Sequence, residues 1–170
     1  MSEEMLVCHC SPTLAGLKTG SLFSCPYSSQ KMIIKEIREF NQKLTQKGIR
    51  IIPVRISDKR MLVYVYRPEK LKEDFSDEKT QIILKCKGYD CTNLSQCICR
   101  LIQKLQSDPD FPHEIGLFLG YPAEDVKGFI ENKAACSKCS GCWKVYGDEQ
   151  AARICLLYTS PSPRDRSLSR

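Results

Sequence analysis

Residues 49–66 read IRIIPVRISDKRMLVYVY, and this stretch decides the fold. Its two ends, residues 49–56 and 61–66, are rich in β-branched and aromatic residues, which favour β-strands. The polar segment SDKR at positions 57–60 separates them and is typical of a turn, so the stretch predicts a β-hairpin. Pro53 has no backbone N–H to donate, which predicts an edge position or a bulge for the first strand.

A long helix is predicted directly before this hairpin. Its apolar residues recur at helical spacing: Ile33, Ile37, Phe40 and Leu44. Ser28 or Ser29 can cap its first turn, and Gly48 is a typical stop signal at its end. Further upstream, residues 5–10 predict a short strand, and residues 11–20 predict a loop at the exit of that strand.

The segment that follows the hairpin is rich in helix signals. Residues 77–87 predict one helix, which Gly88 ends. A second apolar stripe consists of Leu94, Cys97, Ile98, Leu101, Ile102 and Leu105, with Thr92 or Asn93 as its cap. This stripe predicts that Cys97 points inward and that Cys99 lies off the apolar face.

Two shorter helices are predicted next, one over residues 111–120 and one that begins at residues 122–125. Residues 142–146 can form a strand, and a final helix is predicted from Asp148. The order of strand, helix, hairpin, several helices, strand and helix predicts an α+β fold. We expect a single domain with several packed helices and a small, mostly antiparallel sheet.

The charge balance argues against a nucleic-acid partner. The chain has 170 residues and a formal charge of +6. Without the last 15 residues, 23 basic and 19 acidic side chains remain, which is an ordinary balance for a soluble domain. No apolar run is long enough to span a membrane, and the acidic start MSEEM lacks a signal-peptide pattern. We therefore expect a cytoplasmic protein without a membrane partner.

The composition changes near the end of the chain. Residues 155–170 read CLLYTSPSPRDRSLSR, a Ser/Pro/Arg segment without periodicity. We expect residues 1–154 to form the domain and residues 155–170 to be a non-native or disordered tail, with the last helix cut short. The alternative is a Ser/Arg tail that binds RNA or is phosphorylated.

The chain has 11 cysteines, and three of them stand in a C-x-x-C-x-x-C pattern at Cys136, Cys139 and Cys142. This spacing brings three thiolates within reach of one zinc ion or iron-sulfur cluster. Tyr146 stands where a ferredoxin-type run has its fourth cysteine, so another ligand must come from elsewhere. The candidates are Cys10, Cys8, His9 and His113. The alternative is a polar loop with incidental thiols.

Two further groups of residues are candidates for chemistry. On a strand, Cys8 and Cys10 share one face and His9 lies on the other, although small core residues would give the same pattern. His113 and Glu114 follow a proline at a predicted helix start, where the histidine suits proton transfer or ligation. A thiol-dependent enzyme would pair His113 with Cys10 or Cys139.

Three segments resemble one family: His9–Thr19, Pro112–Pro122 and Gly141–Asp148. The chain is similar, over roughly residues 5–154, to the bacterial family called domain of unknown function 3793. The resemblance implies a fold and a bacterial cytosolic setting, and it carries over no catalytic residues. In that family an aromatic residue can replace Cys142, and the last helix continues where this chain departs after Ile154.

Nucleotide-binding, acyl-transfer and zinc-protease functions lack their usual motifs, since no phosphate loop, nucleophile elbow or HExxH sequence is present. The leading hypothesis is a cytosolic, cysteine-rich protein that binds a transition metal, as zinc or an iron-sulfur cluster, or that acts in thiol redox chemistry. One alternative is a non-enzymatic interaction domain with structural cysteines, in which residues 112–125 present a surface to a protein partner. The other alternative is a thiol-dependent enzyme.

Overall fold

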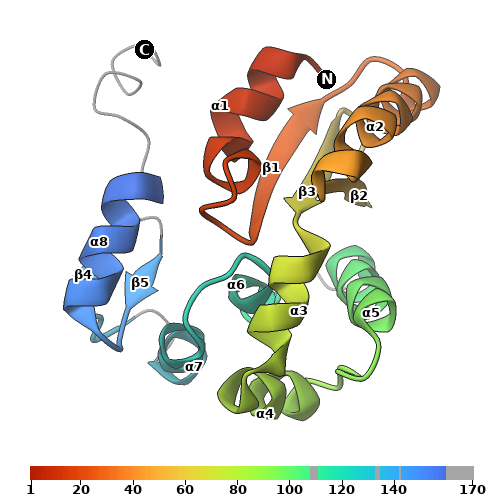
Figure 1. Ribbon diagram of the computed structural model, residues 1–170. Helices are drawn as coiled ribbons and strands as arrows, with labels where there is room; N and C mark the ends of the chain where they lie inside the picture. The colour runs from red at the N-terminus through yellow and green to blue at the C-terminus, as the bar shows by residue number, and fades with distance from the viewer. Residues whose placement is uncertain (108–110, 133–134, 142, 160–170) are drawn as a thin grey trace.

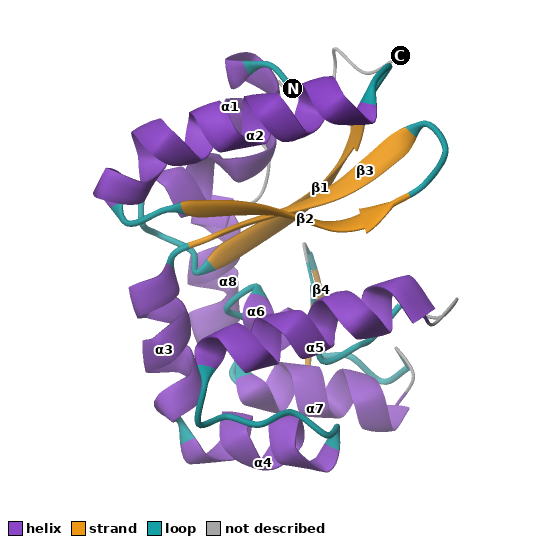
Figure 2. Ribbon diagram, turned by 90° about the vertical axis from the view of Figure 1, so that its right-hand side faces the viewer, coloured by secondary structure: helices purple, strands orange, loops and turns teal. Residues whose placement is uncertain are grey.

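The computed structural model describes residues 1–107, 111–132, 135–141 and 143–159, with side chains as far as Leu156. Figures 1 and 2 show a central three-stranded sheet with helices on both of its faces. The strands are β1 (Gly20–Pro26), β2 (Arg50–Ile56) and β3 (Arg60–Tyr66), which pair antiparallel in the order β1-β3-β2. The α+β prediction is confirmed for the described part of the chain.

The predicted hairpin forms the centre of this sheet. β3 pairs with β2 on one side and with β1 on the other, so β2 is an edge strand. The register of β2 against β3 shifts between Pro53 and Arg55. Both the edge position and the bulge expected from Pro53 are therefore confirmed, because a proline is tolerated only where no ladder hydrogen bond is needed.

The sheet separates two apolar cores. Figure 2 shows α1 (Glu3–Leu14) and α2 (Gln30–Leu44) on one face, where Met61, Val63 and Val65 of β3 point. Tyr64 and Tyr66 point to the other face because side chains alternate along a strand. The core on that face is completed by the helices that follow the β2–β3 hairpin: α3 (Pro68–Ser76), α4 (Glu78–Cys86), α5 (Leu94–Ser107), α6 (Ile115–Phe118) and α7 (Ala123–Asn132).

The strand predicted over residues 5–10 is wrong, because this segment lies inside helix α1. Ser2 caps the helix by accepting a hydrogen bond from the Met5 backbone N–H at 3.2 Å. Leu6, Cys10 and Thr13 follow one another at helical spacing and form its buried face. A short apolar run fits a helix or a strand equally well, and here packing against the sheet decided between them.

Strand β1 begins at the last residue of the predicted loop and continues through residues 21–26, for which no element was predicted. Gly20 begins it, and it pairs with β3 over its whole length. A Cβ atom at Gly20 would lie 2.7 Å from the Phe118 carbonyl oxygen and 2.7 Å from the Tyr64 ring. Glycine is therefore needed at this position for close packing, and its weak strand propensity concealed the strand.

Other local predictions are confirmed. α2 continues as a 3-10 turn, Thr45–Lys47, and ends at Gly48, whose φ is +70°. Asn93 accepts hydrogen bonds from the backbone at the start of α5. Cys97 is buried and Cys99 is exposed, as the stripe indicates. Helix α3 was not predicted as a separate element.

A small hairpin and a helix complete the described chain. β4 (Cys139–Ser140) pairs antiparallel with β5 (Lys144–Val145), and α8 (Glu149–Thr159) follows. α8 includes the first five residues of the predicted tail, and residues 160–170 lie outside the described part. The domain boundary at Ile154 stays a prediction. No helix of the described residues is long and apolar enough to cross a membrane.

Candidate functional site

The cysteine motif lies in and before the β4–β5 hairpin. Cys136 is exposed and has a left-handed backbone conformation, with φ of 57°. Cys139 begins β4 and is half-buried. The Lys138 N–H donates to the Val145 carbonyl at 2.8 Å, which joins the C-x-x-C segment to the hairpin. Cys142 lies outside the described residues, so the three-cysteine site stays a prediction.

Helix α8 packs against this hairpin. A Cβ atom at Gly141 would lie 2.4 Å from a methyl group of Leu156, so the helix approaches the backbone closely there. Arg153 of α8 also lies near the motif. Its pKa is raised by the hydrogen bond and charge of Glu149, and Cys139 adds a smaller effect in the same direction. Cys139 is therefore close enough to this guanidinium group for a weak electrostatic interaction.

The proposed fourth ligands are dispersed. Among the residues that the structure describes, no group of three or more His, Cys, Asp or Glu side chains is arranged to hold a metal ion. Cys10 lies in the core between α1 and the sheet, where burial raises its pKa to about 12. Because α1 is a helix, Cys8 and Cys10 do not share a face: Cys8 is exposed, Cys10 is buried, and His9 stacks on Phe23.

His113 and Glu114 also separate. His113 is exposed, and its ring meets Phe129 edge to face with the centroids 5.0 Å apart. Glu114 is buried and accepts hydrogen bonds from Lys104 at 2.7 Å and from the Tyr89 hydroxyl at 3.1 Å. Burial alone would raise the pKa of Glu114, but the bond to Lys104 and its charge outweigh this effect, so the pKa is lowered. Glu114 therefore joins α5 to the start of α6.

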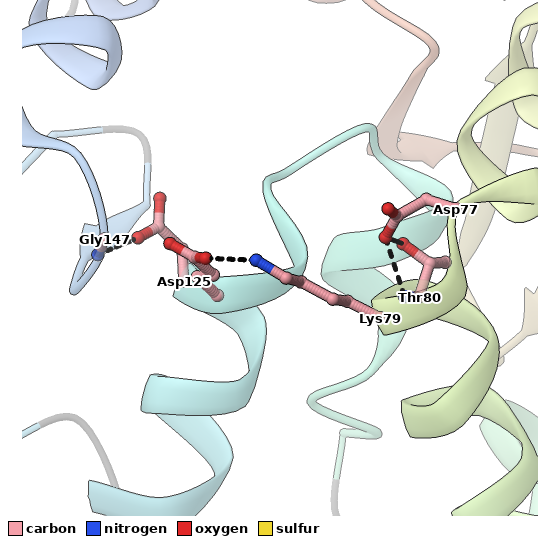
Figure 3. Close-up of polar contacts among 6 residues, drawn as sticks. Asp77, Lys79, Thr80, Asp125 and Gly147 are labelled. Carbon is pink, nitrogen blue, oxygen red and sulfur yellow. Dashed lines mark hydrogen bonds and ion pairs between the residues drawn. The ribbon is translucent and has the colours of Figure 1, made fainter.

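Asp125 connects α7 to the hairpin. It is 2% exposed, and its Oδ1 accepts the backbone N–H groups of Tyr146 at 2.7 Å and Gly147 at 2.8 Å. The indole N–H of Trp143 donates to Oδ2 at 2.8 Å. Figure 3 shows Asp125 directed at Gly147. Lys79 of α4 donates a hydrogen bond to Glu124, the residue before Asp125, at 2.6 Å. One carboxylate thus determines where the chain after β5 lies.

A cavity of about 410 Å³ lies between this hairpin and the α6–α7 segment. We call it the hairpin cleft. It is lined by Phe111, His113, Ile115, Gly116, Tyr121, Asp125, Val126, Phe129, Ser140, Gly141, Trp143 and Lys144. The second and third of the family-like segments, residues 112–122 and 141–148, thus meet at this cleft, although the sequence gives no sign that they are neighbours.

Aromatic pairs line two parts of the cleft. Tyr121 and Trp143 stack with their centroids 4.8 Å apart and their planes at 22°. The pair of His113 and Phe129 lies at the α7 side. Sequence patterns assigned no role in a site to Trp143 or Asp125. Only the burial of Asp125 and its contact with the indole show that these residues build one site.

The family comparison gives one match. The family model described as Protein of unknown function (DUF3793) matches residues 6–160. The match covers most of the chain and includes the cleft, the hairpin and α8 as far as it is described. No curated protein and no solved structure matches the chain.

Proposed function

The chain belongs to the DUF3793 family of proteins of unknown function, and we propose that it binds a small molecule in the hairpin cleft. The observation that carries this proposal is the cleft itself. Its volume of about 410 Å³ falls in the range of small-molecule sites, and such sites are lined mainly by apolar and aromatic side chains with a few polar groups. His113, Ser140 and Lys144 supply those polar groups.

The sole tryptophan of the chain provides a direct measurement. Trp143 lines the cleft, so a molecule that enters it changes the tryptophan fluorescence. We expect some members of a library of small aromatic and aliphatic molecules to change this emission and to stabilise the protein against heat. The Ser140→Phe variant places a ring at the cleft without altering the core, because Ser140 is exposed, and it should lose this binding.

The matched control is Ser95→Phe, an exposed serine on α5 that does not line the cleft. This variant should bind the same molecules as the wild type. Binding that persists unchanged in Ser140→Phe would place the ligand elsewhere and contradict the proposal. The absence of any binding molecule in the library would also contradict it.

A second candidate function is transition-metal binding by Cys136, Cys139 and Cys142. The supporting observation is the left-handed turn at Cys136, which leads within three residues to Cys139 on a closed hairpin. Short turns of this kind bring two thiolates to one ion, and zinc or an iron-sulfur cluster takes up to four. A fourth ligand would have to come from a part of the chain that the structure does not describe or from a partner.

Metal content tests this second candidate. Protein purified without oxygen or chelators should contain about one zinc, or two to four irons with sulfide, per chain. Cys139→Ser should lose the metal, whereas Cys99→Ser, an exposed cysteine on α5, should keep it. A folded, metal-free wild-type protein would count against metal binding and leave the cleft proposal unaffected.

The remaining alternatives gain little support. None of the described cysteines lines the cleft that contains His113, so a catalytic Cys–His pair is not favoured. In the segment 112–125, the residues from Glu114 to Phe118 and Asp125 are buried, so only the other residues of the segment are accessible to a protein partner. The bacterial cytoplasm remains our proposed setting.

A further inference from the structure

We infer that Cys91 and Cys97 form a thiol–disulfide redox site, a pair that closes into a reversible disulfide when it meets a small-molecule disulfide such as oxidised glutathione. This inference goes beyond the proposed function, because neither cysteine lines the hairpin cleft. Three features carry it: the closeness of the two thiols, the way in which the chain between them is held, and their unequal exposure.

The two thiols lie next to one another at the start of α5. Cys97 Sγ donates a hydrogen bond to the Asp90 backbone carbonyl at 2.8 Å, and this carbonyl belongs to the peptide bond that leads into Cys91. Cys91 packs against the same apolar core that contains Cys97, and a hydrogen bond joins the two side chains. Neither cysteine takes part in a disulfide. Two sulfurs in hydrogen-bond contact have to approach by only about 2 Å to form one.

Hydrogen bonds hold the chain between the two cysteines. Asp90 Oδ1 accepts hydrogen bonds from the backbone N–H of Thr92 at 3.0 Å and from its hydroxyl at 2.7 Å. Asn93 Oδ1 accepts the backbone N–H of Ser95 at 2.9 Å, and the Asn93 carbonyl accepts that of Cys97 at 3.1 Å. The loop and the first turn of α5 therefore present both thiols in one arrangement, so joining them costs little conformational freedom.

The unequal exposure of the thiols assigns a different role to each. Cys91 is half-buried, so an external disulfide can reach its sulfur. Cys97 is fully buried, and its sulfur is placed to attack Cys91 Sγ. Cys91 is therefore the thiol that meets the reagent, and Cys97 is the thiol that resolves the intermediate.

The exchange proceeds in two steps. The Cys91 thiolate attacks one sulfur of oxidised glutathione, which breaks the glutathione disulfide, forms a mixed disulfide and releases one glutathione thiolate. The Cys97 thiolate then attacks Cys91 Sγ, which closes the protein disulfide and releases the second glutathione. The protein loses two electrons and two protons, and the two glutathione molecules gain them as thiols.

Burial slows this exchange without favouring the reduced pair. It raises the pKa of Cys91 and raises the pKa of Cys97 to about 11. Few thiolates are present at neutral pH, so disulfide formation should accelerate as the pH rises. A dithiol resists oxidation where its thiolate is stabilised, and neither thiolate of this pair is stabilised in the folded protein.

Oxidation of the full chain by glutathione tests the pair. Reduced protein is held without oxygen at pH 8 in buffers with different ratios of reduced to oxidised glutathione, then acidified and alkylated. Digestion with trypsin and chymotrypsin separates residues 90–94 from residues 95–100. We expect mass spectrometry to find these two peptides joined, with the loss of two hydrogen atoms, and dithiothreitol to release them.

Single-cysteine variants identify the partners. Cys97→Ala should lose the joined peptides. Cys91→Ala should also lose them, and it changes a half-buried residue outside the centre of the core. Cys99→Ser is the matched control: Cys99 lies in the same peptide and on the same helix as Cys97 but is exposed, so this variant should keep the link.

The same equilibrium in urea tests the contribution of the fold. We expect the equilibrium constant for the link to be about tenfold larger in the folded protein than in the unfolded chain, because folding holds the two thiols together. An equal or smaller constant in the folded protein would overturn the inference. So would a wild-type protein without the link, or a link that Cys99→Ser abolishes. Each of these results leaves small-molecule binding in the hairpin cleft unaffected.

Discussion

Asp125 determines the local structure of the cleft at the scale of a single residue. Burying a carboxylate costs free energy unless its oxygens are hydrogen-bonded. Both oxygens of Asp125 accept hydrogen bonds, one from Trp143 just before β5 and two from the backbone just after it. The neighbouring Glu124 has the same charge but lies at the surface, where it pairs with Lys79. Two adjacent acids on α7 therefore have different consequences for stability.

We expect Asp125→Asn to lower the free energy of unfolding by about 2 kcal/mol. The asparagine side chain keeps one oxygen that accepts hydrogen bonds. Its NH₂ group cannot accept the hydrogen bonds that the other carboxylate oxygen accepts in the wild type. The emission wavelength of Trp143 should also change, because the indole N–H loses its negatively charged partner. Urea unfolding followed by fluorescence measures both effects. Glu124→Gln is the matched control and should leave both quantities nearly unchanged; equal effects from the two variants would contradict this account.

At the scale of elements, the end of α6 packs against the chain just before β1. Gly120 follows α6 with φ of +79°, and a Cβ atom there would lie 2.6 Å from the Thr19 hydroxyl oxygen. Gly88 follows α4 with the same φ, but a Cβ atom there would meet no atom within 4 Å. The two glycines share one backbone conformation and differ only in the packing around them.

This pair allows strain and packing to be measured separately. Gly88→Ala should cost about 1 kcal/mol, which is the cost of a left-handed conformation for a residue with a Cβ atom. Gly120→Ala should cost about 2 kcal/mol more, because the methyl group also displaces Thr19. Thermal or urea unfolding of the two variants gives the difference. Equal destabilisation would show that α6 is not held against the start of β1.

The connection between α5 and α6 depends on the buried pair of Lys104 and Glu114. We expect Lys104→Met to destabilise the protein by about 3 kcal/mol, because it leaves a buried carboxylate without its cation. Adding Glu114→Gln to this variant should restore part of the loss, since no unpaired charge remains. A double-mutant cycle by urea unfolding measures the coupling; additive losses would contradict a direct interaction.

At the scale of the whole molecule, one thin sheet supports two cores with different ionisable groups. Cys10 lies in the core under α1, and Cys97, Tyr64 and Tyr89 lie in the core on the other face. Burial raises the pKa of Cys10 to about 12 and that of Cys97 to about 11. The pKa values of both tyrosines are raised by the same cause. Both cores therefore favour the protonated forms of their buried thiol and tyrosine hydroxyl groups.

The stability of the fold should decrease at alkaline pH. A thiol with an ordinary pKa of 9.0 ionises in the unfolded chain before it ionises in the core. Each buried thiol contributes fully to the free energy of unfolding below its ordinary pKa of 9.0. This contribution is lost as the pH rises through the pKa values in the folded protein, about 11 for Cys97 and about 12 for Cys10. The urea midpoint of unfolding should fall between pH 7 and pH 11, and the midpoint of Cys10→Ala should fall less steeply. A constant midpoint would contradict burial of these groups.

Sequence-based predictions were correct where a feature depends on residues close together in the chain, and they failed where it depends on distant residues. The stripe of α5, the stop at Gly48 and the bulge at Pro53 were predicted because each depends on residues close together in the chain. Residues 5–10 were predicted wrongly because their short apolar run suits two structures. β1 was not predicted because its pairing with β3 involves residues about forty positions away.

The sequence by itself determined the α+β class, the hairpin at the centre of the sheet and the family, because periodicity, turn residues and motifs are local properties. The tertiary structure alone decided that α1 is a helix, that Glu114 pairs with Lys104, and that Asp125 holds the β4–β5 hairpin beside α7. The hairpin cleft belongs to this second group. Its walls come from separate segments, and burial and charge pairing, which exist only after folding, bring them together.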